Sequence, residues 1–86
     1  MKCASKSSDI KIYYQADDLA TNQEVIFSVW DDTGTDLVSA FDASAEIDDC
    51  GIYYLDFATP NYDTYLLVKS GLKNGSHPKS FIIKSG

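Results

Sequence analysis

The sequence predicts an all-β protein: a two-sheet antiparallel β-sandwich of seven short strands. Apolar and polar residues alternate with period two in several short segments, as they do on half-buried strands, and no long segment follows a helical period. Turn-forming Gly, Pro, Asn and Asp separate these segments at intervals of about 8–12 residues, which is typical of sandwiches. A chain of 86 residues is long enough for one domain with one core.

The chain is expected to begin with a tail and to continue as a single domain. Residues 1–8 are rich in Ser and Lys and have the composition of an extended or mobile segment, whereas residues 9–86 form the domain. The first predicted strand, 9–15, alternates apolar and polar positions. A polar loop, 16–23, follows it.

A β-hairpin is predicted next, and the other strands are expected to build around it. Residues 24–30 carry an apolar side chain at every second position. The sequence Asp-Asp-Thr-Gly-Thr at 31–35 favours a turn, because glycine accepts a positive φ and Asp side chains bond nearby amides. Residues 36–41 form the returning strand.

Four further segments complete the sandwich. Residues 42–47 fit either a short strand or one helical turn, because their Ala-Ser-Ala-Glu composition tolerates a helix. The other three segments, 52–58, 63–69 and 79–84, are predicted strands bounded by turn residues, and a Gly/Asn/Ser/His/Pro loop spans 70–78.

The expected core follows from the inward positions of these strands. Alternation assigns to it Ile10, Ile12, Val25, Phe27, Val29, Leu37, Phe41, Tyr53, Leu55, Phe57, Leu67 and Phe81.

Charge is segregated along the chain, whose net charge is -6. Three lysines lie within residues 1–11, twelve acids and no Lys or Arg lie within 12–68, and four lysines without an acid lie within 69–86. The acidic balance and the lack of arginine argue against a nucleic-acid partner.

The sequence also indicates in which cellular compartment the protein is expected. It has no apolar run of 18 residues, so no membrane-spanning helix is predicted, and residues 1–8 lack the apolar region of a signal peptide. The chain is therefore expected to stay in the cell that makes it or to leave by lysis or assembly. Cys3 and Cys50 have no CxxC spacing; free thiols are the favoured interpretation, and a disulfide between them stays open.

The acidic turns and the single histidine do not predict a catalytic or metal site. Asp31, Asp32 and Asp36 offer oxygens that suit Ca²⁺, but their spacing is not that of an EF-hand, so a solvated hairpin tip is favoured. His77 has no second histidine or nearby cysteine to complete a zinc site. No Gly-x-Ser-x-Gly nucleophile motif occurs. We therefore expect no enzymatic activity, no cofactor and no metal.

Aromatic side chains are the stronger functional signal. The chain has six tyrosines and one tryptophan, Trp30. Strand alternation turns one ring of the pair Tyr13-Tyr14 outward, and likewise one ring of Tyr53-Tyr54. Outward tyrosines suit protein interfaces or sugar stacking, unless they only cover neighbouring strands.

Two stretches resemble parts of immunoglobulin-like sandwiches. The run Asp-Cys-Gly-Ile-Tyr-Tyr at 49–54 resembles the Asp-x-Gly-x-Tyr corner, in which a tyrosine hydroxyl, here that of Tyr53, ties a loop to the backbone. Leu55 stands where antibody domains have a cysteine, so their inter-sheet disulfide is not available. Alternatively, residues 60–68 are similar to the Pro…Tyr-x-x-Val run of fibronectin type III modules, with Tyr65 at the corner. The resemblance implies an Ig-like fold and leaves the choice of corner open.

A second resemblance covers residues 10–84. The runs Val-Trp-Asp-Asp-Thr-Gly, Gly-Ile-Tyr-Tyr-Leu-Asp-Phe and Asp-Thr-Tyr-Leu-Leu-Val resemble small Ig-like or transthyretin-like modules of bacteriophage virions, found in head decoration, neck and tail proteins. This implies a structural virion protein, made in the host cytoplasm, that contacts copies of itself and other virion proteins. The alternative is a carbohydrate-binding or adhesion module that recognises a host glycan.

The expected contacts lie on lysines and outward aromatic rings. The first and last strands of Ig-like sandwiches often share an edge, so the terminal lysines are expected to gather there, away from the acids. Such a molecule can dock head to tail with its copies, through charge and strand addition, and the tail can order on contact. Alternatively, the lysines only protect the edge from aggregation. The interface candidates are Lys2, Lys6, Lys11, Tyr13, Trp30, Tyr54, Tyr62, Lys79 and Lys84.

Overall fold

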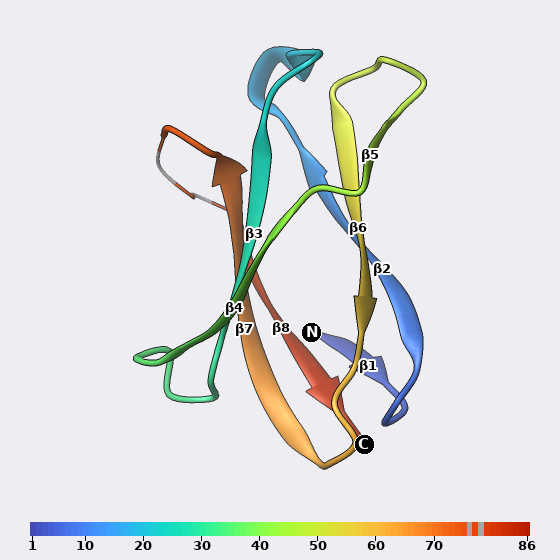
Figure 1. Ribbon diagram of the computed structural model, residues 1–86, viewed down its shortest axis with the longest axis vertical. Helices are drawn as coiled ribbons and strands as arrows, with labels where there is room; N and C mark the ends of the chain where they lie inside the picture. Colours follow the sequence, from blue (N-terminus) through green and yellow to red (C-terminus); the bar gives the residue numbers. More distant parts are fainter. Residues whose placement is uncertain (76, 78) are drawn as a thin grey trace.

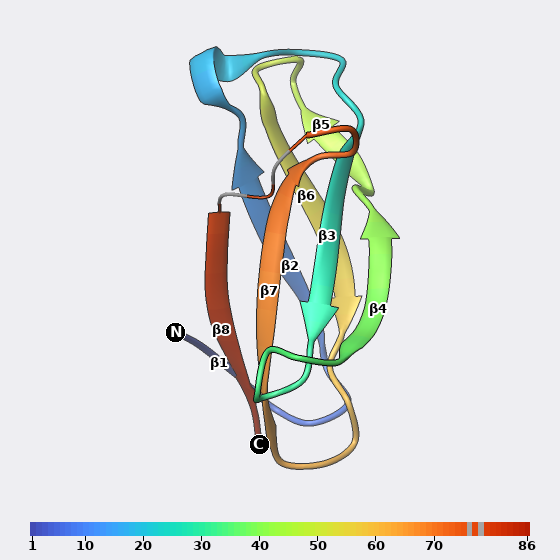
Figure 2. The ribbon, with the colours of Figure 1, turned by 90° about the vertical axis from the view of Figure 1, so that its left-hand side faces the viewer.

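Two β-sheets packed face to face form the protein (Figure 1). The computed structural model describes residues 1–75, 77 and 79–86. The larger sheet has five strands in the order β1-β8-β7-β3-β4, and the smaller sheet has three in the order β2-β6-β5. The view at right angles shows the larger sheet in front of the smaller one (Figure 2).

The described residues contain eight strands and one short 3₁₀ turn. The elements are β1 (Lys2–Ala4), β2 (Asp9–Gln15), η1 (Asp17–Leu19), β3 (Val25–Trp30), β4 (Leu37–Asp42), β5 (Ala45–Ile47), β6 (Ile52–Ala58), β7 (Thr64–Leu72) and β8 (Lys79–Ser85).

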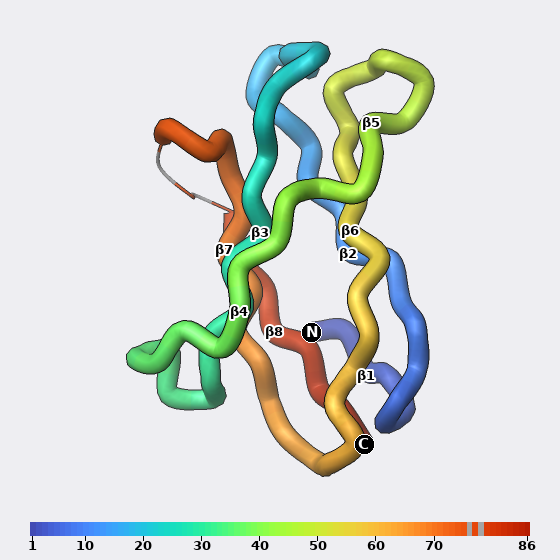
Figure 3. Tube along the Cα trace, viewed as in Figure 1, coloured from blue at the N-terminus to red at the C-terminus, as the bar shows by residue number. Residues whose placement is uncertain are grey.

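The prediction of an all-β protein with two sheets is confirmed. The alternating segments 9–15 and 52–58 are β2 and β6, and the ambiguous segment 42–47 contains strand β5 rather than a helical turn. Between β4 and β5 the chain crosses from the larger to the smaller sheet (Figure 3). Strand β7 extends into the predicted loop 70–78, of which Ser76 and Pro78 lie outside the described residues.

The number and direction of the strands differ from the prediction. Residues 1–8 are not a free tail, because β1 pairs in parallel with β8, and the Thr59 hydroxyl donates a hydrogen bond to Ser5 O at 2.7 Å. The described sheets therefore contain eight strands instead of seven, and one pair is parallel. A strand as short as Lys-Cys-Ala has no alternation to detect, so its partner strand and not its own pattern decides its conformation.

The core lies between the two sheets. Alternate positions of β2 and β6 face alternate positions of β3, β7 and β8, so both sheets contribute to one cluster. Its buried apolar residues are Ile12, Tyr14, Ala16, Val25, Phe27, Val29, Tyr53, Leu55, Phe57, Leu66, Val68 and Ile83; the predicted Ile10, Phe41 and Phe81 are only partly buried against it.

Two predicted core residues, Leu37 and Leu67, lie instead on the outer face of the larger sheet. The register shifts between Val29 and Trp30, so β4 holds one extra residue there and Leu37 turns outward, 53% exposed. In β7 three apolar residues run together, so no polar neighbour marks the inner face. The inner face of β7 is set by the pairing of Val68 with the buried Val29, which places Leu67 on the outer face of the sheet.

Candidate interaction surface

Four strands of the larger sheet each contribute one apolar residue to a row across its outer face. Leu37 of β4 pairs with Trp30 of β3, Trp30 pairs with Leu67 of β7, and Leu67 pairs with Ile82 of β8. Directly opposite residues point to the same side of a sheet, and Trp30 follows the buried Val29, so the row points away from the core. We call these four residues the apolar row.

Two lysines flank the apolar row. The Lys69 ammonium lies 4.9 Å from the centroid of the Trp30 ring, in a cation–π arrangement. On the other side, Lys84 pairs with Tyr65, whose side chain is 48% exposed. The outer face therefore combines exposed apolar area with positive charge.

The Trp30 indole has an unused donor. Its Nε1 is buried and has no hydrogen-bond partner among the described residues. A buried donor without a partner costs about 1–3 kcal/mol, so this indole N–H is an unfavourable feature of the fold. Trp30 as a whole is half-buried on the outer face, and its role in an interface stays a prediction.

The outer face of the smaller sheet holds a second aromatic group. Tyr13 and Tyr54 pair across β2 and β6 with ring centroids 6.4 Å apart, whereas Tyr14 and Tyr53 are buried, as alternation predicts. Lys11 lies 4.1 Å from the Tyr54 ring centroid. The ring of Tyr13 is 54% exposed.

Lys11 is also held by an ion pair. Its Nζ lies 2.8 Å from an Asp56 carboxylate oxygen on the neighbouring strand. This hydrogen bond raises the pKa of Lys11 above its usual value. Both side chains are solvent-exposed, so the pair orients Lys11 over Tyr54 more than it stabilises the fold.

The predicted lysines do not gather at one edge. The first and last strands are neighbours, as expected, and Lys2 and Lys84 lie on them. Lys6 and Lys79 lie at opposite ends of the molecule, each 3.5 Å from an aspartate carboxylate oxygen, and Lys11 belongs to the smaller sheet. The remaining candidate, Tyr62, is exposed in the loop between β6 and β7.

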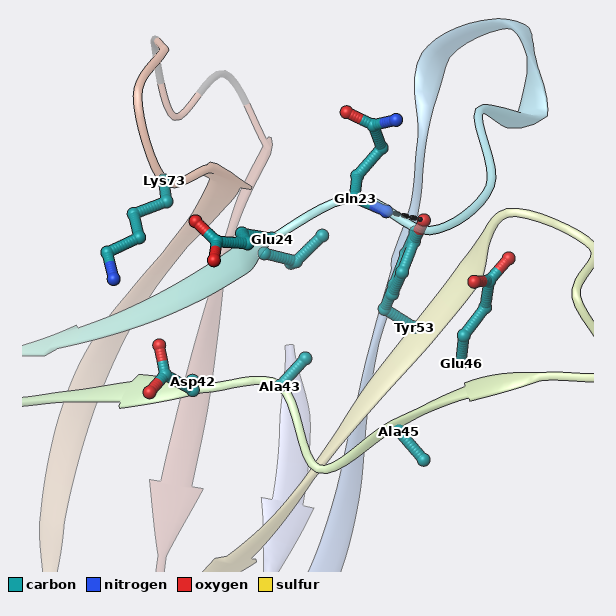
Figure 4. Close-up of a pocket in the computed structure, with 9 residues that line it drawn as sticks. Gln23, Glu24, Asp42, Ala43, Ala45, Glu46, Tyr53 and Lys73 are labelled. Carbon is teal, nitrogen blue, oxygen red and sulfur yellow. Dashed lines mark hydrogen bonds between the residues drawn. The ribbon is translucent and has the colours of Figure 1, made fainter.

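The Tyr53 side chain forms hydrogen bonds to the loop before β3, at the end of the molecule shown in Figure 4. The Tyr53 hydroxyl donates to Ala20 O at 2.8 Å and accepts from the Gln23 N–H at 3.0 Å. Tyr65, the other candidate for a corner tyrosine, is half exposed on the outer face. Of the two tyrosines, Tyr53 is therefore the one whose hydroxyl ties a loop to the backbone.

Glu46 makes a second tie at the same end. Its carboxylate accepts the Asn22 N–H at 3.0 Å and the Gly51 N–H at 2.8 Å, so it joins the loop before β3 to the turn before β6. The sequence alone does not predict this role. A single glutamate on a short strand has the pattern of a surface acid, and only the approach of two loops supplies its donors.

A polar pocket of about 320 Å³ lies beside these ties. Glu24, Asp42 and Lys73 lie together on one side of it, and Tyr53 and Glu46 on the other (Figure 4). Within the described residues, no group of three or more His, Cys, Asp or Glu side chains has the arrangement of a metal site. The part of the chain that the structure describes also has no helix long and apolar enough to cross a membrane.

The hairpin tip is organised by its own first aspartate. The Asp31 carboxylate accepts the Thr33 hydroxyl at 2.8 Å and the Thr35 N–H at 3.2 Å. The hydrogen bond from Thr33 is the main cause that lowers the pKa of Asp31. Asp31 therefore acts as a turn-capping side chain in this structure.

Comparison with protein-family models, with curated proteins and with solved structures finds no match for this chain.

Removing the Tyr53 hydroxyl should loosen the loop end. We expect Tyr53→Phe to lower the free energy of unfolding by about 1–3 kcal/mol, because it leaves the Gln23 N–H and the Ala20 carbonyl without their partner. The matched control is Tyr54→Phe, which removes a hydroxyl on the outer face and should stay within about 0.5 kcal/mol of the parent. Urea unfolding measures the free energy of unfolding of both variants. An equal loss in the two would contradict a stabilising role for the Tyr53 hydroxyl hydrogen bonds.

Proposed function

We propose that the protein is a non-enzymatic structural module of a bacteriophage virion, acting through protein–protein contacts. The observation that carries this proposal is the apolar row, which exposes aliphatic side chains beside an aromatic ring on the outer face of the larger sheet. Exposed apolar surface of this kind marks interaction sites in soluble proteins. Aromatic anchors with a charged rim are typical of protein interfaces.

The outer face of the larger sheet suits a protein partner better than a sugar. Sugar stacking needs an open ring face, and Lys69 lies over Trp30. Leu37 and Ile82, at the two ends of the row, offer no hydrogen-bonding group to sugar hydroxyls. A protein partner can instead bury the apolar row against its own apolar side chains.

An Ig-like classification of the sandwich is part of the same proposal. Its support is the Tyr53 hydroxyl, which ties a loop to the backbone from within an Asp-x-Gly-x-Tyr run. The tie reaches the loop before β3, about thirty residues upstream, and so spans further than the short-range corner of antibody domains.

Particles purified from a phage source of this sequence test the proposal. Mass spectrometry should find the protein at a fixed stoichiometry to the major capsid or tail protein. In a phage carrying Leu67→Gln we expect incorporation to fall at least about tenfold, because a polar amide replaces the centre of the row. Tyr13→Gln, on the other sheet, is the control and should leave incorporation unchanged. Absence of the wild-type protein from washed particles would refute the function.

The second candidate function is carbohydrate binding or adhesion through the smaller sheet. The observation that favours it is the half-exposed ring of Tyr13 beside Tyr54, with polar Lys11 and Asp56 next to them. A glycan array showing one specific ligand, lost in Tyr13→Ala and retained in Leu67→Gln, would favour this candidate over virion assembly.

A further inference from the structure

Strand β4 is an edge strand with one bulge and no basic residue. Among the described residues it pairs only with β3, and its six residues include no Lys, Arg or Pro. The Ala43 N–H bonds to Val25 O at 2.9 Å, so by alternation the main-chain groups of Ala40 and Asp42 point to the free edge. Val38, the extra residue of the bulge, is 56% exposed.

An apolar crevice of about 150 Å³ opens next to this edge. Strand β5 pairs with β6 at residues 52–54, so in the described part of the chain the last residues of β6 have no neighbouring strand on the side facing β4. The crevice lies in this gap and is lined by Val38, Phe41, Phe57, Leu66 and Tyr62. An extended segment at the β4 edge would cover it.

Charge complementarity indicates what that segment is. Asp36 precedes β4 and Asp42 is its last residue, and no lysine or arginine occurs between residues 12 and 68. The opposite edge of the same sheet is formed by β1, with Lys2 on it and Lys84 on its neighbour. Because the Gly86 N–H bonds to Ala4 O, the main-chain groups of Cys3 point to the free side of β1.

We propose that the free edge of β4 in one molecule takes the free edge of β1 of a second copy, so that the larger sheets join head to tail. Two different edges meet in this contact, which makes it heterologous, and it propagates into a ring or a filament. Main-chain bonds at Cys3, Ala40 and Asp42 supply the pairing, and Lys2 against the acidic edge sets the direction. The inference rests on the proposed function, since it names the self-contact of an assembly module.

Charge reversal tests the pairing with folded protein. Sedimentation velocity should show a mass that rises with concentration at low salt and returns to the monomer at about 0.5 M salt. Lys2→Glu alone, and Asp42→Lys alone, should each weaken association at least about tenfold. An equimolar mixture of the two variants should recover it, because each offers the edge that the other lacks. Lys69→Glu, on the central strand β7, and Asp9→Lys, on the smaller sheet, are matched controls away from both edges and should behave as wild type.

Disulfide trapping gives an independent readout that does not depend on charge. In a Cys50→Ser background, Ala40→Cys should form an interchain disulfide with the exposed Cys3 of another molecule on mild oxidation. Gln15→Cys, on an edge of the smaller sheet, should not. Equal cross-linking of both variants, a wild-type protein that stays monomeric at all concentrations, or a variant mixture that does not recover would overturn the proposal.

The two proposals fail separately. If the protein is present in purified particles but does not self-associate, the virion function is supported and the edge contact is refuted. Conversely, the protein could self-associate with the expected charge-reversal pattern and yet be absent from particles. That result would support the edge contact and refute the virion function.

Discussion

Phe27→Ala should lower the free energy of unfolding by about 3–5 kcal/mol, close to the lower end of the stability of a whole domain. Phe27 has 0% exposure and lies in the middle of β3, with strands on both sides and the smaller sheet in front. Truncation to Ala leaves a cavity that close-packed neighbours cannot fill. Circular dichroism during urea unfolding, or the thermal midpoint, measures the loss.

Tyr62→Ala is the control for aromatic truncation at the surface. Tyr62 is 58% exposed, so its loss should change stability by less than about 1 kcal/mol. If Phe27→Ala melts within a few degrees of the parent, as Tyr62→Ala should, then Phe27 does not occupy the centre of the core.

Gly51→Ala should destabilise the protein by about 2–4 kcal/mol, because both the conformation and the space at this position require glycine. Gly51 has φ +80°, and an added Cβ would lie 2.4 Å from the Leu19 backbone carbon. That neighbour is main chain and cannot rotate away. The Gly51 N–H and carbonyl also bond to Glu46 and Ala16, so a shift of the turn would break both contacts.

Gly75→Ala is the matched control. A Cβ at Gly75 would meet only ordinary contacts, the nearest being Leu72 Cβ at 3.6 Å. We expect that variant to stay within about 0.5 kcal/mol of the parent. Hydrogen exchange should show faster opening of loops 16–24 and 47–51 in Gly51→Ala only; a similar loss of stability in both variants would contradict the close packing of Gly51 against Leu19.

Local pattern was sufficient wherever one face of a strand is apolar and the other polar. In β2 and β6, Ile12 and Leu55 alternate with charged or tyrosine neighbours, and both strands were predicted with their observed bounds. Local pattern failed where it gave no sign of face or partner. Leu67 sits within a continuous apolar run, and Leu37 lies beyond a bulge that depends on pairing with β3.

The candidate surfaces show the same division. Alternation predicted that Tyr13 and Tyr54 point outward, and composition identified Trp30 as an interface candidate. The apolar row was not foreseen, because it joins four residues from four strands and depends on the register between them. The acceptor role of Glu46 was missed for a related reason, since its two donors come from separate loops.

The sequence by itself determined the all-β class, most strands, the central place of Phe27 and the segregation of charge, because each follows from the types and spacing of neighbouring residues. Only the tertiary structure decided that residues 2–4 join the sheet, that Lys2 and Asp42 lie on opposite edges of it, and that one apolar row faces outward. These features depend on which strands pair and in which register. That choice is made by the packing of the whole core, through contacts between residues far apart in the chain.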